Sequence, residues 1–251
     1  MSKENAKQNQ RVEEVVSSSP EERPVLTEIV TILDRSGSMA GLESDTIGGY
    51  NGFLEEQRKL EGEAILTTVL FDNQYELLHD RVDIQEVTLL TKGDYFVRGS
   101  TALLDAIGYS IQKIVHAHRL LPDERKPKKT IFMIITDGHE NASRDYRYDE
   151  IQRMIQKERD IYGWEFIFMG ANIDAVAAAR DIGIHPDRSV RYQADAYGTG
   201  MNFKAMNMIN NMVRKSKKIS PDWSDEIRAY QEQEEKDSDP QGTPGTKKPR
   251  K

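Results

Sequence analysis

Continuous apolar runs alternate along this chain with segments whose apolar residues recur every three or four positions. The continuous runs cover residues 25–33, 64–71, 130–135 and 164–169, and they predict strands that are buried on both faces. The periodic segments cover residues 46–60, 101–118, 148–162, 174–183 and 201–218, and they predict helices with one buried face. Residues 75–84 follow a turn at Asp72-Asn73 and predict an antiparallel edge strand, while residues 189–192 predict a last short strand.

This alternation predicts an α/β fold with a doubly wound, mostly parallel central sheet, one antiparallel edge strand and helices on both faces. We expect the domain to span residues 24–218, an ordinary size for a single domain. Both flanks are polar. Residues 1–23 are expected to be disordered, and residues 219–251 are expected to form a tail that is partly helical and then disordered.

Short polar residues directly follow the first predicted strand, in the run Asp34-Arg35-Ser36-Gly37-Ser38. One carboxylate and two hydroxyls at alternate positions can turn their oxygens toward one point, as a hard cation requires. Asp137 follows the most apolar strand in the same way. Ligands of parallel sheets bind beyond the carboxyl ends of the strands, so the two acidic strand ends are expected to share one crevice.

The residues at these strand ends match a known family pattern. The pattern consists of Asp34-x-Ser36-x-Ser38, Thr101 within Gly99-Ser100-Thr101-Ala102-Leu103, and Asp137 within Thr136-Asp137-Gly138. In order and placement it resembles the metal-ion-dependent adhesion site of von Willebrand factor type A domains, which have a Rossmann-like fold. The resemblance covers roughly residues 25–195 and is closest to stand-alone intracellular members of prokaryotic or phage type.

This resemblance implies a set of metal ligands and a way of binding. Ser36, Ser38 and Thr101 would offer hydroxyl oxygens, and Asp34 and Asp137 would bind the cation directly or through water. The cation implied is Mg²⁺, with Mn²⁺ or Ca²⁺ as alternatives, because Mg²⁺ keeps waters and needs few protein ligands. An Asp or Glu of a partner protein would complete the coordination, so the chain is expected to be an adaptor in a larger intracellular assembly.

Plainer interpretations remain open for several of these residues. Asp34, Asp137 and Thr101 could each cap the helix that follows. Asp105, one turn further along, is expected to be a solvated helix carboxylate rather than a second ligand shell. Arg35 and the polar segment 139–148 are expected near the metal rim, where arginine and tyrosine are typical recognition residues, although an ordinary polar loop fits equally well.

Composition excludes several other functions. A net charge of −7 argues against a dedicated nucleic-acid binder, and the sequence has no cysteine for disulfides, thiolate metal sites or thiol catalysis. Apolar runs are too short to span a bilayer, so a cytoplasmic protein without membrane contact is expected. Phosphate-binding glycine loops and the hydrolase nucleophile elbow are absent from the sequence.

Three functions therefore remain. The first is a non-enzymatic module that binds an acidic motif of a partner through the cation. The second is a metal-dependent hydrolase that activates water with the same cation, with His139 or Glu140 as the general base. The third is a scaffold whose metal serves stability alone. Neither the identity of the partner nor the oligomeric state follows from the sequence.

Overall fold

A six-stranded sheet forms the centre of the molecule in a computed structural model that describes residues 25–171 and 174–238. Its strand order is β3-β2-β1-β4-β5-β6, and each neighbouring pair is parallel except β2 and β3. The strands are β1 (Thr27–Asp34), β2 (Ala64–Phe71), β3 (Tyr75–Asp83), β4 (Lys129–Thr136), β5 (Glu165–Ala171) and β6 (Ser189–Tyr192). The mostly parallel sheet with one antiparallel edge strand is thereby confirmed.

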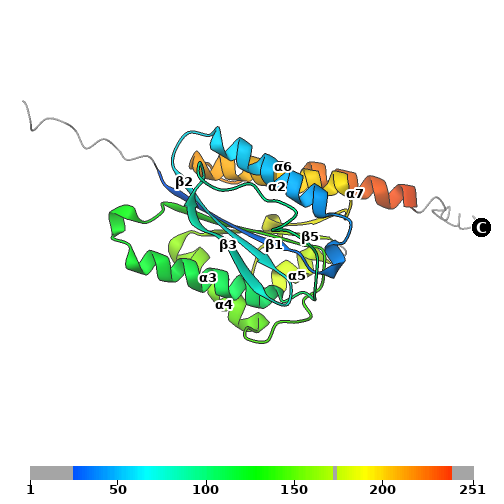
Figure 1. Ribbon diagram of the computed structural model, residues 1–251, viewed down its shortest axis with the longest axis horizontal. Helices are drawn as coiled ribbons and strands as arrows, with labels where there is room; N and C mark the ends of the chain where they lie inside the picture. Colours follow the sequence, from blue (N-terminus) through cyan, green and yellow to red (C-terminus); the bar gives the residue numbers. More distant parts are fainter. Residues whose placement is uncertain (1–24, 172–173, 239–251) are drawn as a thin grey trace, which may run out of the picture.

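Helices cover both faces of the sheet (Figure 1). One face carries α2 (Glu43–Arg58), α6 (Ala196–Arg214) and α7 (Asp225–Ser238), and the other carries α3 (Leu103–Leu120), α4 (Tyr148–Tyr162) and α5 (Ala175–Asp181). This arrangement follows from the strand order. Right-handed crossovers that move outward in opposite directions from β1 must place their helices on opposite faces.

Successive side chains of the central strands point to opposite faces of the sheet, which divides the interior into two apolar layers. In β1, Ile29 and Leu33 pack toward α2 and α6, whereas Val30 and Ile32 pack toward α3. Both sets are buried, which explains why apolar residues occur on both faces of this strand. The core therefore confirms the inference drawn from the continuous apolar runs.

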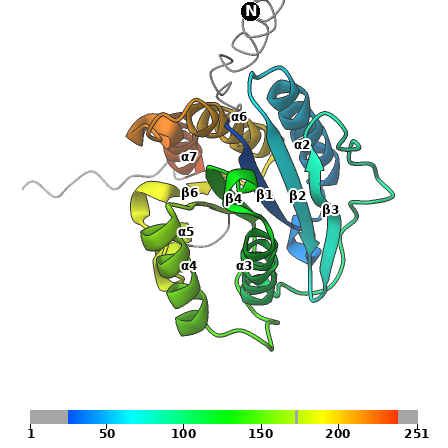
Figure 2. The same cartoon turned by 90° about the vertical axis from the view of Figure 1, so that its left-hand side faces the viewer.

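The strand order reverses between β1 and β4, which lie side by side at the centre of the sheet (Figure 2). Leu33 of β1 is in register with Ile135 of β4, so both strands end at the same level. Asp34 and Asp137 consequently leave the sheet at one edge, at the switch point where ligands of doubly wound folds bind.

The C-terminal part of the described chain departs from the expected boundaries. Helix α6 begins at Ala196, five residues before the expected start, because the Asp195 carboxylate accepts a hydrogen bond from Gly198 N at 2.7 Å and caps it. The packed unit also continues beyond residue 218. Trp223 and Ile227 are each 2% exposed and belong to the core beneath α6 and α7. The segments expected to be disordered, 1–23 and the end of the tail, fall outside the described residues.

No helix among the described residues is long and apolar enough to cross a lipid bilayer.

Two neighbouring glycines of α2 offer a matched test of the packing between α2 and α6. A Cβ added at Gly49 would overlap the ring of Phe203, whereas a Cβ at Gly48 would meet open space. We expect Gly49→Ala to lower the free energy of unfolding by about 1–2 kcal/mol through overpacking. Gly48→Ala should raise it by about 0.5–1 kcal/mol, because alanine favours the helix. Urea unfolding of both variants measures the difference, and equal shifts would contradict the α2–α6 packing.

Candidate metal centre

Five oxygen-bearing side chains meet at the carboxyl ends of β1 and β4. Ser36 Oγ lies 3.0 Å from Ser38 Oγ and accepts a hydrogen bond from Thr101 Oγ1 at 3.0 Å. Ser38 Oγ donates to Asp137 Oδ1 at 2.5 Å. Asp34 joins this series of hydrogen bonds because its carboxylate accepts one from the Ser36 backbone N–H. The structure thus brings together all five residues that the sequence pattern selected from three separate segments.

Local backbone geometry fixes the Asp34 carboxylate within this cluster. Its Oδ1 accepts from Ser36 N at 2.7 Å, and its Oδ2 accepts from Thr136 Oγ1 at 2.6 Å. Gly138 leaves room beside the hydroxyls, since a Cβ there would come within 3.0 Å of both Ser38 Oγ and Thr101 Oγ1. Thr136 and Gly138 are therefore part of the site, although the sequence analysis assigned them no role.

Burial raises the pKa values of both carboxyl groups at this site. Burial raises the pKa of Asp34 to about 6 even though Thr136 and Ser36 donate hydrogen bonds to it, and the negative charge of Asp137 adds a smaller increase. Burial also raises the pKa of Asp137. Within the described residues, Asp137 Oδ2 is buried and has no hydrogen-bond partner. An unpaired carboxylate oxygen beside three hydroxyls is the donor set that a hard cation takes.

The assignment of a cation site here depends on hydroxyl oxygens. In the part of the chain that the structure describes, no three Asp, Glu or His side chains gather into a metal-binding group. The site therefore has two carboxylates at most and depends on neutral oxygens. Such a site neutralises a divalent cation only in part, which leaves it able to attract a further anion.

Simple helix capping does not account for these residues. Helix α3 begins at Leu103, and its capping position, Ala102, has no side chain that could accept a hydrogen bond. Thr101 instead donates to Ser36, and the N–H of Leu104 is bound by the Glu140 carboxylate at 2.9 Å. Asp34 and Asp137 do not cap the next α-helices either, because the capping position is Leu42 in α2 and Arg147 in α4.

Arg35 does not lie at the metal rim, so that expectation was wrong. Its side chain is fully buried and points away from the hydroxyls. Its Nε contacts Asp72 Oδ2 at 3.1 Å, and its Nη2 contacts Glu76 Oε2 at 2.6 Å. Side chains along this extended segment alternate in direction. Ser36 and Ser38 face the crevice, so Arg35 between Asp34 and Ser36 points the other way. Arg35 therefore fastens the metal-site loop to the β2–β3 hairpin.

Two carboxylates hold the segment after Asp137 in place. Asp105 accepts the backbone N–H groups of residues 144, 145 and 146 at 2.9–3.0 Å, so it is not a solvated helix carboxylate. Glu140 accepts from the N–H groups of Leu104, Ala142 and Ser143 and from the Ser143 hydroxyl. Asn141 N and Ala142 N also donate to the Thr101 carbonyl. The segment is thus a pinned loop against the start of α3.

Comparison with known proteins shows the fold. No protein-family model matches the sequence, and no curated protein is similar to it. Solved structures with a similar fold include proximal thread matrix protein 1 from the mussel byssus, with 12% identity over 76% of this chain and 47% of that one and a TM-score of 0.53. A von Willebrand factor type A protein from Catenulispora acidiphila shares 16% identity over 75% of this chain and 43% of that one, with a TM-score of 0.52.

A second structure of the mussel protein is described as having a zinc-occupied MIDAS motif, the metal-ion-dependent adhesion site named above. It shares 14% identity over 75% of this chain and 46% of that one, with a TM-score of 0.52. This chain therefore has the fold of von Willebrand factor type A domains and spans less than half the length of these neighbours.

The buried Arg35–Asp72 pair can be tested without any metal. Replacing Arg35 by methionine should lower the free energy of unfolding by about 3 kcal/mol, because Asp72 would stay buried with only Arg98 beside it. Arg98→Met is the control, since that side chain is 39% exposed and its removal should cost less than about 1 kcal/mol. Urea unfolding in EDTA measures both. Equal losses would show that Arg35 has no special structural role.

Proposed function

We propose that this chain is a metal-dependent protein-binding module in which Asp34, Ser36, Ser38, Thr101 and Asp137 hold a divalent cation. The observation that carries the proposal is the cluster of three hydroxyls closed by Asp137, whose buried Oδ2 has no partner in the described residues. Mg²⁺ suits the few protein oxygens best, and Mn²⁺ or Ca²⁺ are alternatives. The zinc-occupied motif of the mussel protein supports a divalent cation at this edge of the fold.

An Asp or Glu of a partner protein would complete the coordination of the cation. When bound, the cation supplies a positive charge that the neutral hydroxyls leave largely uncompensated, and this charge attracts a carboxylate. The residues of the chain do the positioning: Thr136 orients Asp34, and Ser38 orients Asp137. The module would act as an adaptor within a larger intracellular assembly, for which the cysteine-free sequence is suited.

Geometry gives the hydrolase alternative less support than the binding function. A general base needs an oxygen or nitrogen that is free to take a proton from water. The Glu140 oxygens already accept four hydrogen bonds and organise the backbone around Ser143 and Leu104. His139 is exposed and lies next to the site in sequence, and it remains the one base of the original pair that is accessible. The hydrolase thus rests on one exposed histidine, whereas binding rests on the clustered oxygen donors, and we propose binding rather than catalysis.

Metal binding is tested by titrating Mg²⁺ into the purified chain and following its unfolding. A ligand at a hundred times its dissociation constant stabilises the folded state by about 2.7 kcal/mol. Asp137→Asn should weaken Mg²⁺ binding at least about tenfold, because it removes one of the two charges in the site. Asp145→Asn is the matched control on the neighbouring loop and should keep the full effect. Equal stabilisation of both variants would refute the ligand assignment.

Partner binding is tested by immobilising the chain and measuring the capture of a partner protein. We expect capture to be lost in EDTA, restored by Mg²⁺, reduced by an acidic competitor peptide and lost in Asp34→Ala, while circular dichroism shows that the variant stays folded. A scaffold that uses metal for stability alone predicts a lower melting temperature in EDTA but capture that ignores the acidic peptide. Capture that is indifferent to EDTA and to Asp34→Ala would rule out the metal mechanism.

A further inference from the structure

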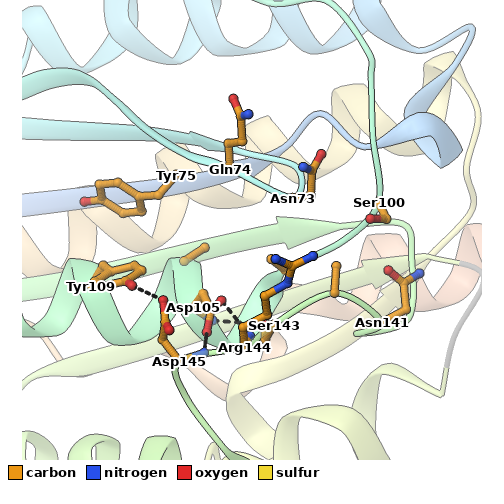
Figure 3. A pocket seen from close by; sticks show the side chains of 13 residues that line it. Asn73, Gln74, Tyr75, Ser100, Asp105, Tyr109, Asn141, Ser143, Arg144 and Asp145 are labelled. Carbon is orange, nitrogen blue, oxygen red and sulfur yellow. Dashed lines mark hydrogen bonds between the residues drawn. The ribbon is translucent and has the colours of Figure 1, made fainter.

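A pocket of about 670 Å³ adjoins the candidate metal centre. It lies between the β2–β3 turn, the start of α3 and the loop at residues 141–145 (Figure 3). Two of its lining residues connect it to the metal ligands: Ser100 directly precedes Thr101, and Asn141 Oδ1 accepts a hydrogen bond from Thr101 N at 2.9 Å. A partner whose carboxylate reaches the cation would therefore place its neighbouring residues at this pocket.

The wall of this pocket is built before any partner arrives. The backbone of residues 144–146 is held by Asp105, and that of residues 142–143 is held by Glu140. Tyr146 packs against Gly108 of α3, where an added Cβ would overlap its ring. Little backbone order has to be gained on binding, and such preorganisation favours affinity.

Arg144 is the charged group that this wall presents to the pocket. Its backbone N–H is bonded to Asp105, but its side chain is exposed, and across residues 25–171 and 174–238 no carboxylate forms an ion pair with its guanidinium. In Figure 3 the side chain extends across the pocket toward the turn at Asn73 and Gln74. An unpaired guanidinium held on a fixed backbone is suited to bidentate capture of a carboxylate.

The other polar groups of the pocket lie at its two ends. At the end near the metal, Asn141 has its Oδ1 engaged, which leaves its Nδ2 to donate, and Ser100 adds a hydroxyl. The acidic residues lie further away, and both are engaged: Asp105 with three backbone amides and Asp145 with the Tyr109 hydroxyl. The free hydrogen-bonding capacity beside the metal centre therefore consists mainly of donors.

We infer that this pocket binds a second acidic side chain of the same partner, through Arg144 and with help from Asn141. The inference rests on the proposed function, since it takes the first carboxylate to be the one at the cation. It specifies that function further: the recognised motif carries two acidic residues, one for the metal centre and one for Arg144. A bidentate arginine–carboxylate pair at this exposed site would contribute about three- to tenfold in affinity.

Labelled peptides titrated into the full chain in Mg²⁺ test this inference. Each peptide carries one fixed Glu and, at one of the next four positions, a second Glu, a Gln or a Lys, and fluorescence anisotropy measures its affinity. At one spacing we expect the second Glu to strengthen binding about three- to tenfold over Gln. Arg144→Gln should remove that preference and leave the affinity for the Gln peptide unchanged, and Arg144→Glu should favour Lys instead.

Arg153→Gln provides the matched control, because Arg153 is an exposed α4 residue paired with Asp149 outside the pocket, and this variant should keep the preference. A wild-type chain that favours Lys over Glu, that shows no preference at any spacing, or that keeps its preference in Arg144→Gln would overturn the inference while metal-dependent binding stands. Peptide binding that persists in EDTA and in Asp137→Asn would instead overturn the proposed function, and this inference with it.

Discussion

Two carboxylates emerge side by side from adjacent parallel strands, and the surrounding structure depends on how their charge is accommodated. The register of β1 and β4 places Asp34 and Asp137 at one edge, and both are buried there. Burial and mutual repulsion raise the pKa of Asp34 to about 6. Hydroxyls from Thr136 and Ser38 relieve part of this cost through hydrogen bonds. A bound cation would relieve the rest, and this is the physical reason for expecting one at this point.

A second layer of charged residues holds the segments that carry the site. Arg35 and Arg98 share the buried carboxylate of Asp72, which joins the metal-site loop to the β2–β3 hairpin. On the other side, Asp105 and Glu140 bind backbone amides and fix the loop after Asp137 to α3. These groups are removed from the hydroxyl cluster, yet they decide the positions of its neighbours. The same contacts leave Arg144 exposed on a fixed backbone, with its charge directed into the pocket beside the metal centre.

Sequence reasoning was most successful where a pattern is short and local. Continuous apolar runs identified β1, β2, β4 and β5, and the turn at Asp72-Asn73 identified the antiparallel edge. It was less successful where distant segments decide the outcome. Helix α6 begins in a glycine-containing stretch that looks like a loop, because Asp195 caps it and Gly198 packs closely against the carbonyl of Gln193. Trp223 and Ile227 follow a change of composition, yet they complete the core.

The sequence by itself determined the α/β architecture, because that follows from the periodicity of apolar residues. It also selected the five oxygen-bearing residues, through their resemblance to a known family pattern. Only the tertiary structure decided what the intervening residues do. Arg35 lies between two of those five residues, but strand-like alternation turns it away from them, toward a carboxylate 37 residues along the chain. Asp105 and Glu140 likewise acquire their roles from backbone groups about 40 residues distant. No local pattern encodes such partners, because their positions depend on how the sheet brings loops together.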